Sequence, residues 1–433
     1  MSLTARLGRA ARAAVSDITP LRESPAYRRL FAGQAVSSIG TQVTQVAVPV
    51  QVYSLTHSSL QVGLVSLAAL VPLIFFGLYG GAIADAVERR RLLLITSVGT
   101  MAVSVALLVQ AAAGMRSVPL LFVCVAVQAA FAAVDAPARR SITPLLVRPE
   151  KLPAANTLSY GSMTFSVIVG PVLAGVAVAA GGFQWAYGID VASFVAALYA
   201  VARLPALPAA EDAPRAGLAS VLQGLRFVRG QRIIMATFLA DINAMIFGMP
   251  KALYPALAFG QYHGGAGTAS LMYAAPAAGA LLMTGLGGLI TGVRHQGRGV
   301  ILAIVVWGGS IALFGATSLL WFGLLMLALA GAADQVSAVY RSTMMQVVTP
   351  PGLQGRLQGV YMVVVAGGPR LGDLESGAVA TAFTPRVSVV SGGLACLAGI
   401  GLLAALVPSL LRYDSREAVA ERARLGEASP SVA

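Results

Sequence analysis

The sequence predicts an all-α membrane protein with twelve transmembrane helices in two pseudo-symmetric six-helix bundles. The composition, the spacing of apolar runs and the placement of basic residues predict this fold. The chain has 433 residues, of which 57% are hydrophobic and only 11% are charged, whereas soluble domains carry about 25% charged residues. So much apolar surface cannot be hidden in aqueous cores, and we expect it to face lipid.

Twelve apolar runs follow one another along the chain, each near the roughly 20 residues that a helix needs to cross a bilayer. In order they cover residues 30–53, 60–84, 92–113, 119–138, 157–180, 186–204, 233–257, 268–292, 299–317, 319–340, 357–382 and 387–411. Several contain Gly or Pro, which spanning helices tolerate when neighbouring helices satisfy the freed backbone groups. We therefore expect each run to form one transmembrane helix.

The 30 Lys and Arg residues lie almost entirely in the two terminal tails and in every second connection. Only Arg116 and Arg386 lie in the opposite connections, while Lys251 and Arg370 lie inside runs. Basic residues concentrate in cytoplasmic loops. The pattern therefore predicts a multi-pass protein of the inner (plasma) membrane with both termini in the cytoplasm.

The longest polar connection divides the runs into six and six. The predicted organisation is a cytoplasmic N-terminal tail (1–29), an N-terminal six-helix bundle (30–204), a cytoplasmic linker (205–232), a C-terminal six-helix bundle (233–411) and a cytoplasmic C-terminal tail (412–433). Similar residues recur in the same order in both halves: Gly80 and Gly81 with Gly287 and Gly288, Arg140 and Ser141 with Arg341 and Ser342, and Gly170 and Pro171 with Gly368 and Pro369. Such duplication is typical of secondary transporters, which bind their substrate between the halves.

The connection after the second run carries a motif of small and charged residues. Its members are Gly81, Ala84, Asp85, Arg89 and Arg90. The segment resembles the loop 2–3 signature of the major facilitator superfamily, Gly-x-Leu-Ala-Asp-Arg-x-Gly-Arg-Arg, and departs from it at Ala86 and Glu88. The resemblance implies that Asp85 contacts the start of the eleventh span near Arg356 and stabilises the outward-facing state. The alternative is an ordinary basic loop.

The fifth run contains Gly170, Pro171 and Gly175, which resemble the tail of the superfamily's antiporter motif, Gly-Pro-x-x-Gly-Gly, with Ala174 in place of one Gly. This resemblance implies a bent, close-packed helix that limits leakage, and the alternative is an ordinary kinked helix. The motif of the fourth span, with an intramembrane Arg, is missing, since that run has only Gln128 before Asp135.

Five segments narrow the resemblance to the enterobactin exporter family. They are residues 47–52, 55–59, 61–64, 253–258 and 273–275, and the overall likeness runs from about residue 25 to 410. It implies a monomeric secondary transporter that exports a catecholate siderophore or a similar small amphipathic molecule by proton antiport, without a cofactor. Close relatives in this branch export many drugs or macrolides, so broad multidrug efflux is the alternative.

Ionisable residues inside the runs are costly in a bilayer and therefore point to function. Asp241, Asp373 and Glu375 are candidate proton carriers, with Asp241 ranked first, because a buried carboxylate can exchange a cation for a proton. We expect Arg370 to pair with Asp373, and residues 367–369 (Gly-Gly-Pro) to interrupt their helix. Lys251 and Arg370 are candidates for attracting an anionic substrate. The alternative is a static set of ion pairs.

The first run has a polar face at helical spacing. Gln34, Ser38, Gln42 and Gln45 form it and predict a wet substrate cavity, although packing between helices would explain them almost as well. Tyr254, Tyr273 and Tyr361 are candidates for stacking on an aromatic ligand, although Tyr is also common at membrane interfaces. Two further pairs, Asp135 with Arg139 or Arg140 and Asp334 with Arg341, occupy equivalent positions in the halves and are predicted to be gate or packing ion pairs rather than substrate ligands.

Other classes of protein are disfavoured by the same residues. No phosphate-binding Gly-x-x-x-x-Gly-Lys-Ser/Thr motif occurs. The histidines are few and scattered, so we expect neither a metal site nor an enzyme. Cys124 and Cys396 lie in apolar runs and are expected to be reduced. The basic residues lie in short clusters between apolar runs, which argues against nucleic-acid binding.

Overall fold

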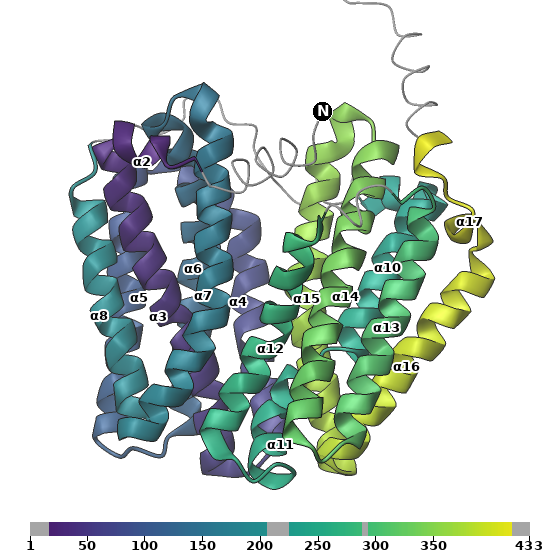
Figure 1. The fold of residues 1–433 in the computed structure, drawn as a ribbon. Coiled ribbons are helices and arrows are strands. Elements are labelled where there is room, and N and C mark those ends of the chain that lie inside the picture. The colour runs from purple at the N-terminus through teal and green to yellow at the C-terminus, as the bar shows by residue number, and fades with distance from the viewer. Residues whose placement is uncertain (1–16, 206–224, 288–292, 418–433) are drawn as a thin grey trace, which may run out of the picture.

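The computed structural model describes residues 17–205, 225–287 and 293–417, and in these ranges its regular elements are all helices. A short helix, α2 (Thr19–Glu23), precedes six long ones. These are α3 (Pro25–Thr56), α4 (Ser59–Ala86), α5 (Arg89–Ala112), α6 (Val118–Leu146), α7 (Leu152–Gly181, after the one-turn η1, Pro149–Lys151) and α8 (Phe183–Ala202). They form the N-terminal half, in which α3 packs on α7 and α8, α4 on α6, and α5 on α6 and α8 (Figure 1).

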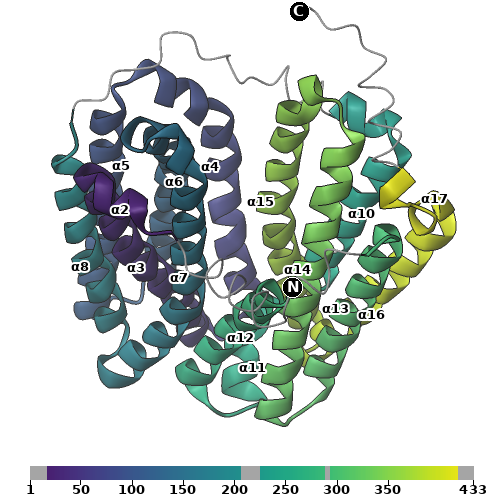
Figure 2. The same ribbon diagram turned by 45° about the horizontal axis from the view of Figure 1, so that its top comes forward.

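The C-terminal half repeats this number of spanning units. Its elements are α10 (Arg232–Phe247), η2 (Lys251–Leu253), α11 (Tyr254–Gly260), α12 (Gly265–Gly285), α13 (Gln296–Ala316), α14 (Leu320–Val348), α15 (Pro351–Ala382), α16 (Pro385–Leu406) and α17 (Pro408–Leu411). The α10–η2–α11 stretch crosses as one interrupted unit, and α13 packs on α14 and α16. Figures 1 and 2 show the two halves side by side.

Ten stretches of the described chain are long and apolar enough to cross a membrane. Two further helices of 32 residues each, α3 and α15, pack within the same bundles and carry more polar residues. Together they agree with the predicted twelve spans. Large apolar side chains such as Val71, Leu282 and Trp321 are exposed on the outside, as a lipid-facing surface requires.

Side-chain caps and glycine define several helix ends. The hydroxyls of Ser24, Ser117 and Thr384 accept a backbone N–H in the first turns of α3, α6 and α16, which satisfies donors that a helix start otherwise leaves unpaired. Gly182, with φ of 79°, joins α7 to α8, because this left-handed conformation favours glycine. Several helices extend beyond the predicted runs, and α6 and α14 each continue eight residues further, to Leu146 and Val348.

Two prolines act differently from one another. The seventh span is interrupted at residues 248–250, where Pro250 has no N–H to continue α10. By contrast, the predicted interruption at residues 367–369 is wrong, since α15 runs unbroken from 351 to 382 through Pro369. Close packing supports it: a Cβ on Gly372 would lie 2.4 Å from the Met245 carbonyl oxygen of α10.

The two ends of the molecule differ in charge and in packing. The connections after α4, α6 and α14 and the segments α2 and α17 lie at one end, which we call the basic end. At the opposite end, the sealed end, α4 packs on α15 and α7 on α12 across the two halves. A Cβ on Gly63 would lie 2.4 Å from the Asp373 carbonyl oxygen, and one on Gly175 would lie 2.8 Å from Ser270 Cβ.

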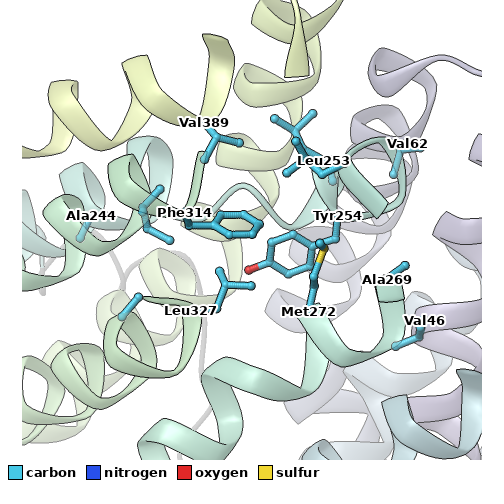
Figure 3. Packing of buried hydrophobic residues seen from close by; sticks show 14 of the residues in the cluster. Val46, Val62, Ala244, Leu253, Tyr254, Ala269, Met272, Phe314, Leu327 and Val389 are labelled. Atoms are coloured by element: carbon cyan, nitrogen blue, oxygen red, sulfur yellow. The ribbon is translucent and has the colours of Figure 1, made fainter. Parts of the chain in front are cut away.

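The main hydrophobic cluster continues through both halves near the sealed end. Val46 and Val62 come from α3 and α4, while Leu253, Tyr254 and Met272 come from the C-terminal half, and all are buried (Figure 3). The halves therefore share one core at this end.

Candidate functional site

A large polar cavity lies between the halves on the side of the basic end. Its volume is about 1060 Å³, and its walls come from α3, α5, α6, α7, α8 and α15. The lining residues are Gln34, Ser37, Ser38, Thr41, Gln42, Gln45, Ser97, Thr100, Gln128, Ala132, Asp135, Ala136, Arg139, Arg140, Thr143, Pro144, Leu152, Asn156, Ser159, Tyr160, Met163, Ser166, Phe194, Gln358, Tyr361 and Met362. Most of the polar groups are neutral hydroxyls and amides, so the cavity offers hydrogen bonds more than charge.

The polar face of α3 forms one wall of this cavity. Gln34, Ser38, Gln42 and Gln45 all line it. Their spacing brings them to the same side of the helix because residues three and four apart share a helix face. The placement agrees with the prediction of a wet cavity, and their binding of a substrate stays a prediction.

One predicted ion pair stands at the wall of the cavity. Arg139 Nε donates to the Asp135 carboxylate four residues earlier on α6. Thr96 Oγ1 also donates to Asp135 at 2.6 Å, and Arg139 Nη2 lies 3.4 Å from Ser97 Oγ. Neighbouring Arg140 is exposed and forms no ion pair with any described residue. The pair is thus present, whereas its action as a gate stays a prediction.

A buried group of three charges connects α10 with α14. Arg341 pairs through Nη1 with Asp241 and lies 3.8 Å through Nη2 from Asp334. The side chains of Arg341 and Asp241 are only 3% and 2% exposed. The predicted Asp334–Arg341 pair is therefore part of a triad in which Asp241 is the closer partner.

Asp373 has different partners from the predicted ones. Instead of pairing with Arg370, it accepts hydrogen bonds from Ser66 Oγ of α4 at 2.6 Å and from the Ala252 backbone N–H of η2 at 2.9 Å. The Arg370 guanidinium donates to the Ala366 carbonyl of its own helix. The prediction of an Asp373–Arg370 pair is wrong because the α4 hydroxyl and the η2 amide lie closer to the carboxylate.

Comparison with known proteins decides the family. The model of the transmembrane secretion effector family matches residues 15–428. The chain belongs to this family of the major facilitator superfamily. The enterobactin exporters EntS of Citrobacter koseri and Escherichia coli K12 are each 30% identical to this chain. The similarity covers 92% of this chain and 95% of each exporter. It is therefore a multi-pass membrane transport protein.

Solved structures agree on the fold. The nucleoside transporter NupG superposes with a TM-score of 0.68 at 13% identity, over 90% of this chain and 99% of that one. A bacterial homologue of the human lysosomal transporter Spinster superposes with a TM-score of 0.67 at 13% identity. The superposition covers 92% of this chain and 97% of that one. At such identities the likeness shows the major facilitator fold alone.

Three of the other predicted site residues of this secretion effector lie outside the cavity. Tyr254 is 2% exposed and packs edge-on against Tyr273 and Phe314. Lys251 is exposed at the start of η2, and its carbonyl accepts the Tyr273 hydroxyl at 3.0 Å. Glu375, a candidate proton carrier, is half-buried on α15. These three residues are therefore not part of the lining of this cavity, and their predicted roles stay predictions.

The motif residues lie at the end of α4 and the start of α5. Gly81, Ala84 and Asp85 lie in the last turns of α4, and their side chains and the predicted contact near Arg356 are outside the described residues. Arg89 and Arg90 begin α5, and Arg90 Nη2 donates to the Ala202 carbonyl at 2.8 Å. A Cβ on Gly170 would lie 2.4 Å from Gln42 Cβ of α3. Gly170 and Gly175 of α7 thus lie where this helix closely approaches α3 and α12. That this packing limits leakage stays a prediction.

Sequence reasoning missed one acidic residue. Asp190 of α8 is fully buried, and its Oδ2 accepts hydrogen bonds from Thr44 Oγ1 at 2.8 Å and Ser104 Oγ at 2.7 Å. The available signal was a lone acid within the apolar run 186–204. Among the described residues no cluster of metal-binding side chains occurs, and both cysteines are free and buried.

Proposed function

We propose that the protein exports a siderophore-like, enterobactin-type amphipathic molecule across the cell membrane by proton antiport and alternating access. One observation carries the proposal: the halves enclose a polar cavity at the basic end while they pack together at the sealed end. The names of the curated relatives, enterobactin exporters with 30% identity, support the direction and class of substrate.

The basic end is the cytoplasmic end in this proposal, because Lys and Arg concentrate in cytoplasmic loops. The described structure then corresponds to an inward-open state, in which a molecule made in the cell enters from the cytoplasm. Export follows when the sealed end opens and the basic end closes around the molecule.

The cavity suits a larger amphipathic molecule. Its volume of about 1060 Å³ is at the upper limit of the roughly 300–1,000 Å³ that ligand pockets usually have. Hydroxyls and amides of α3 offer neutral hydrogen bonds, Tyr160 is 73% exposed for ring stacking, and Arg140 offers an unpaired positive charge. A catecholate with amide groups matches these three features.

Proton coupling requires carboxylates whose partners change between states. Asp373 meets this requirement, since its bond from Ser66 crosses the two halves and must break when the sealed end opens. Asp241 shares Arg341 with Asp334, so protonation of either acid changes the charge of the triad. We therefore keep Asp241, Asp373 and Glu375 as candidate proton carriers, and Asp241→Asn with unchanged pH-driven transport would remove Asp241.

Broad multidrug or macrolide efflux is the second candidate. Met163 is 62% exposed and Met362 is 43% exposed, and both line the cavity. Flexible Met side chains adapt to ligands of different shape. This adaptable apolar side of the cavity would admit unrelated lipophilic molecules.

The test compares metabolites secreted by iron-starved producing cells with and without the gene. We expect the deletion strain to retain a catecholate inside and the complemented strain to secrete it. Resistance to unrelated lipophilic drugs, with unchanged siderophore secretion, would favour multidrug efflux. Unchanged secretion together with unchanged drug sensitivity would contradict both.

A further inference from the structure

A carboxyl group of the N-terminal half is buried without a cation. Asp190 is 0% exposed, and both of its hydrogen bonds, from Thr44 and Ser104, reach the same oxygen, Oδ2. The other oxygen, Oδ1, has no hydrogen-bond partner in the described chain. Both hydrogen bonds to this carboxyl group therefore come from neutral hydroxyls, and neither comes from a cation.

The surroundings contain no charge that would stabilise the ionised form. The helices packed on α8 are α3, α5 and α7, and between their charged ends they hold no Asp, Glu, Lys or Arg. Their titratable side chains in this part are Tyr53 and Tyr160, while α8 itself adds Tyr187 and Tyr199. An isolated ionised carboxylate in an apolar interior is far more costly than the neutral acid, so these surroundings favour a bound proton at Asp190.

A row of hydroxyls on α5 lies between this buried acid and the cavity. The Thr100 and Ser104 hydroxyls donate to the backbone carbonyls of Thr96 and Thr100 at 2.8 and 3.2 Å, so they must rotate to pass a proton. Thr96, Thr100 and Ser104 are spaced four residues apart on α5 and therefore share one face of the helix. At one end Ser104 donates to Asp190, and at the other end Thr96 donates to Asp135 at 2.6 Å. Thr100 lies between them and lines the cavity together with Asp135.

We propose that Asp190 is a proton-binding site of the N-terminal half, which exchanges its proton with the cavity along the hydroxyl row of α5. The inference rests on the proposed proton antiport and adds a carrier outside the charged groups of the C-terminal half. In the step, the O–H bond at Asp190 breaks and the proton passes to the water of the cavity or to the Asp135 carboxylate. Asp190 then carries the negative charge, and no electrons are transferred.

The proton would also affect the charge at the cavity wall. Asp135 pairs with Arg139, and a proton on Asp135 removes the negative partner of that cation. Arg139 then becomes available to an anionic molecule in the cavity. Proton release by Asp190 is thereby linked to substrate binding through Asp135.

The experiment compares wild type with Asp190→Asn and Asp190→Glu in proteoliposomes, with enterobactin as the probe. We expect Asp190→Asn to lose the stimulation of transport by an imposed pH gradient while it keeps gradient-independent exchange of enterobactin. Asp190→Glu should recover part of the stimulation, because it restores a titratable group. Full stimulation in Asp190→Asn would overturn the inference.

Infrared spectroscopy provides a readout that does not depend on transport. Wild type should show the C=O band of a protonated carboxylic acid, and that band should be missing in Asp190→Asn; an identical band in both proteins would also overturn the inference. If transport by the wild type does not respond to the pH gradient, proton antiport is wrong as the proposed function. The infrared comparison still decides the protonation of Asp190 in that case. Thr100→Val, which removes one hydroxyl of the row and keeps Asp190, should slow the pH response.

Discussion

Three carboxylates inside the membrane have three different kinds of partner. Asp241 pairs with Arg341, Asp373 accepts a hydroxyl and a backbone N–H, and Asp190 accepts two hydroxyls. Only the first has a cation in direct contact. Removing a partner should therefore affect stability most at the triad and proton binding most at Asp190.

Arg341→Met should destabilise the protein strongly. The change leaves Asp241 buried without its cation and removes the nearby cation of the partly exposed Asp334, and breaking a buried ion pair on one side typically costs about 3–5 kcal/mol. Thermal unfolding in detergent measures the effect. The matched control is the double variant with Asp241→Asn, which should recover much of the loss because it removes one unpaired charge. A wild-type melting temperature for Arg341→Met alone would contradict a role of the triad in stability.

Tyr160→Ala should weaken substrate binding with little effect on stability. Tyr160 lines the cavity and is 73% exposed, and an aromatic pair contributes about 0.5–1.5 kcal/mol, so the apparent KM for an aromatic substrate should rise roughly two- to tenfold. Tyr199→Ala is the control, since Tyr199 is 58% exposed on α8 and lies outside the cavity lining. Equal changes in KM for both variants would argue against stacking at Tyr160.

The hydrogen-bond and ion-pair partners of residues on different helices were the hardest feature to predict from the sequence. The polar face of α3 was found because its members lie within one helix, where spacing fixes their common side. The partner of Asp241 is 100 residues away on α14, where local spacing cannot indicate it. Asp190 obtains its donors from Thr44 and Ser104 on two other helices. Only the three-dimensional packing brings such groups together.

At the scale of helices, the sealed end is formed by close approaches of α4 to α15 and of α7 to α12. Small residues permit these contacts: a Cβ on Gly377 would lie 2.7 Å from the Ser59 carbonyl oxygen. Membrane helices approach closely where small residues lie at the interface. Opening of this end therefore requires both helix pairs to separate.

A disulfide between α7 and α12 should lock the transporter. The Cβ position at Gly175 is 2.8 Å from Ser270 Cβ, so Gly175→Cys with Ser270→Cys can form a disulfide, with Cβ atoms roughly 3.5–4.5 Å apart, after a small shift. Oxidation should stop transport, and a reductant should restore it. Each single-cysteine variant should be insensitive to oxidant. Full transport by the cross-linked protein would show that this end does not open.

The short helix α2 is anchored by Asp17, which lies outside the membrane. The Thr19 hydroxyl and amide and then Lys151 donate to its carboxylate and lower its pKa from 3.8 to about 2. The stabilisation by this carboxylate is complete above its ordinary pKa and is lost only as the pH falls toward about 2. Lys151→Ala should therefore leave the pH profile of transport unchanged between roughly pH 5 and 8. A shifted profile would place part of the pH response at α2.

The sequence predicted which segments form helices better than it predicted where a helix is interrupted. Apolar length and alternating basic loops predicted the spans because the bilayer requires both. Pro250 and Pro369 look alike in sequence, yet only the first interrupts its helix. The difference lies in the packing of α15 against α10, which local sequence does not contain.

At the scale of the whole molecule, the two halves share one apolar core at the sealed end and separate around the polar cavity at the basic end. Chain duplication predicted two similar bundles and a site between them. It could not predict which end is open, because both arrangements keep the same helices and the same loops. The conformation follows from contacts between the halves, not from the halves themselves.

Distances between spin labels across the halves test alternating access most directly. One pair, Asn156→Cys with Gln358→Cys, spans the cavity at the basic end, and a second, Ser58→Cys with Ala382→Cys, spans the sealed end. The background is a variant with Cys124→Ala and Cys396→Ala, and both positions are buried. On addition of enterobactin under a pH gradient, we expect the basic-end distance to shorten as the sealed-end distance lengthens. Distances that stay fixed, or that change in the same direction at both ends, would contradict transport by alternating access.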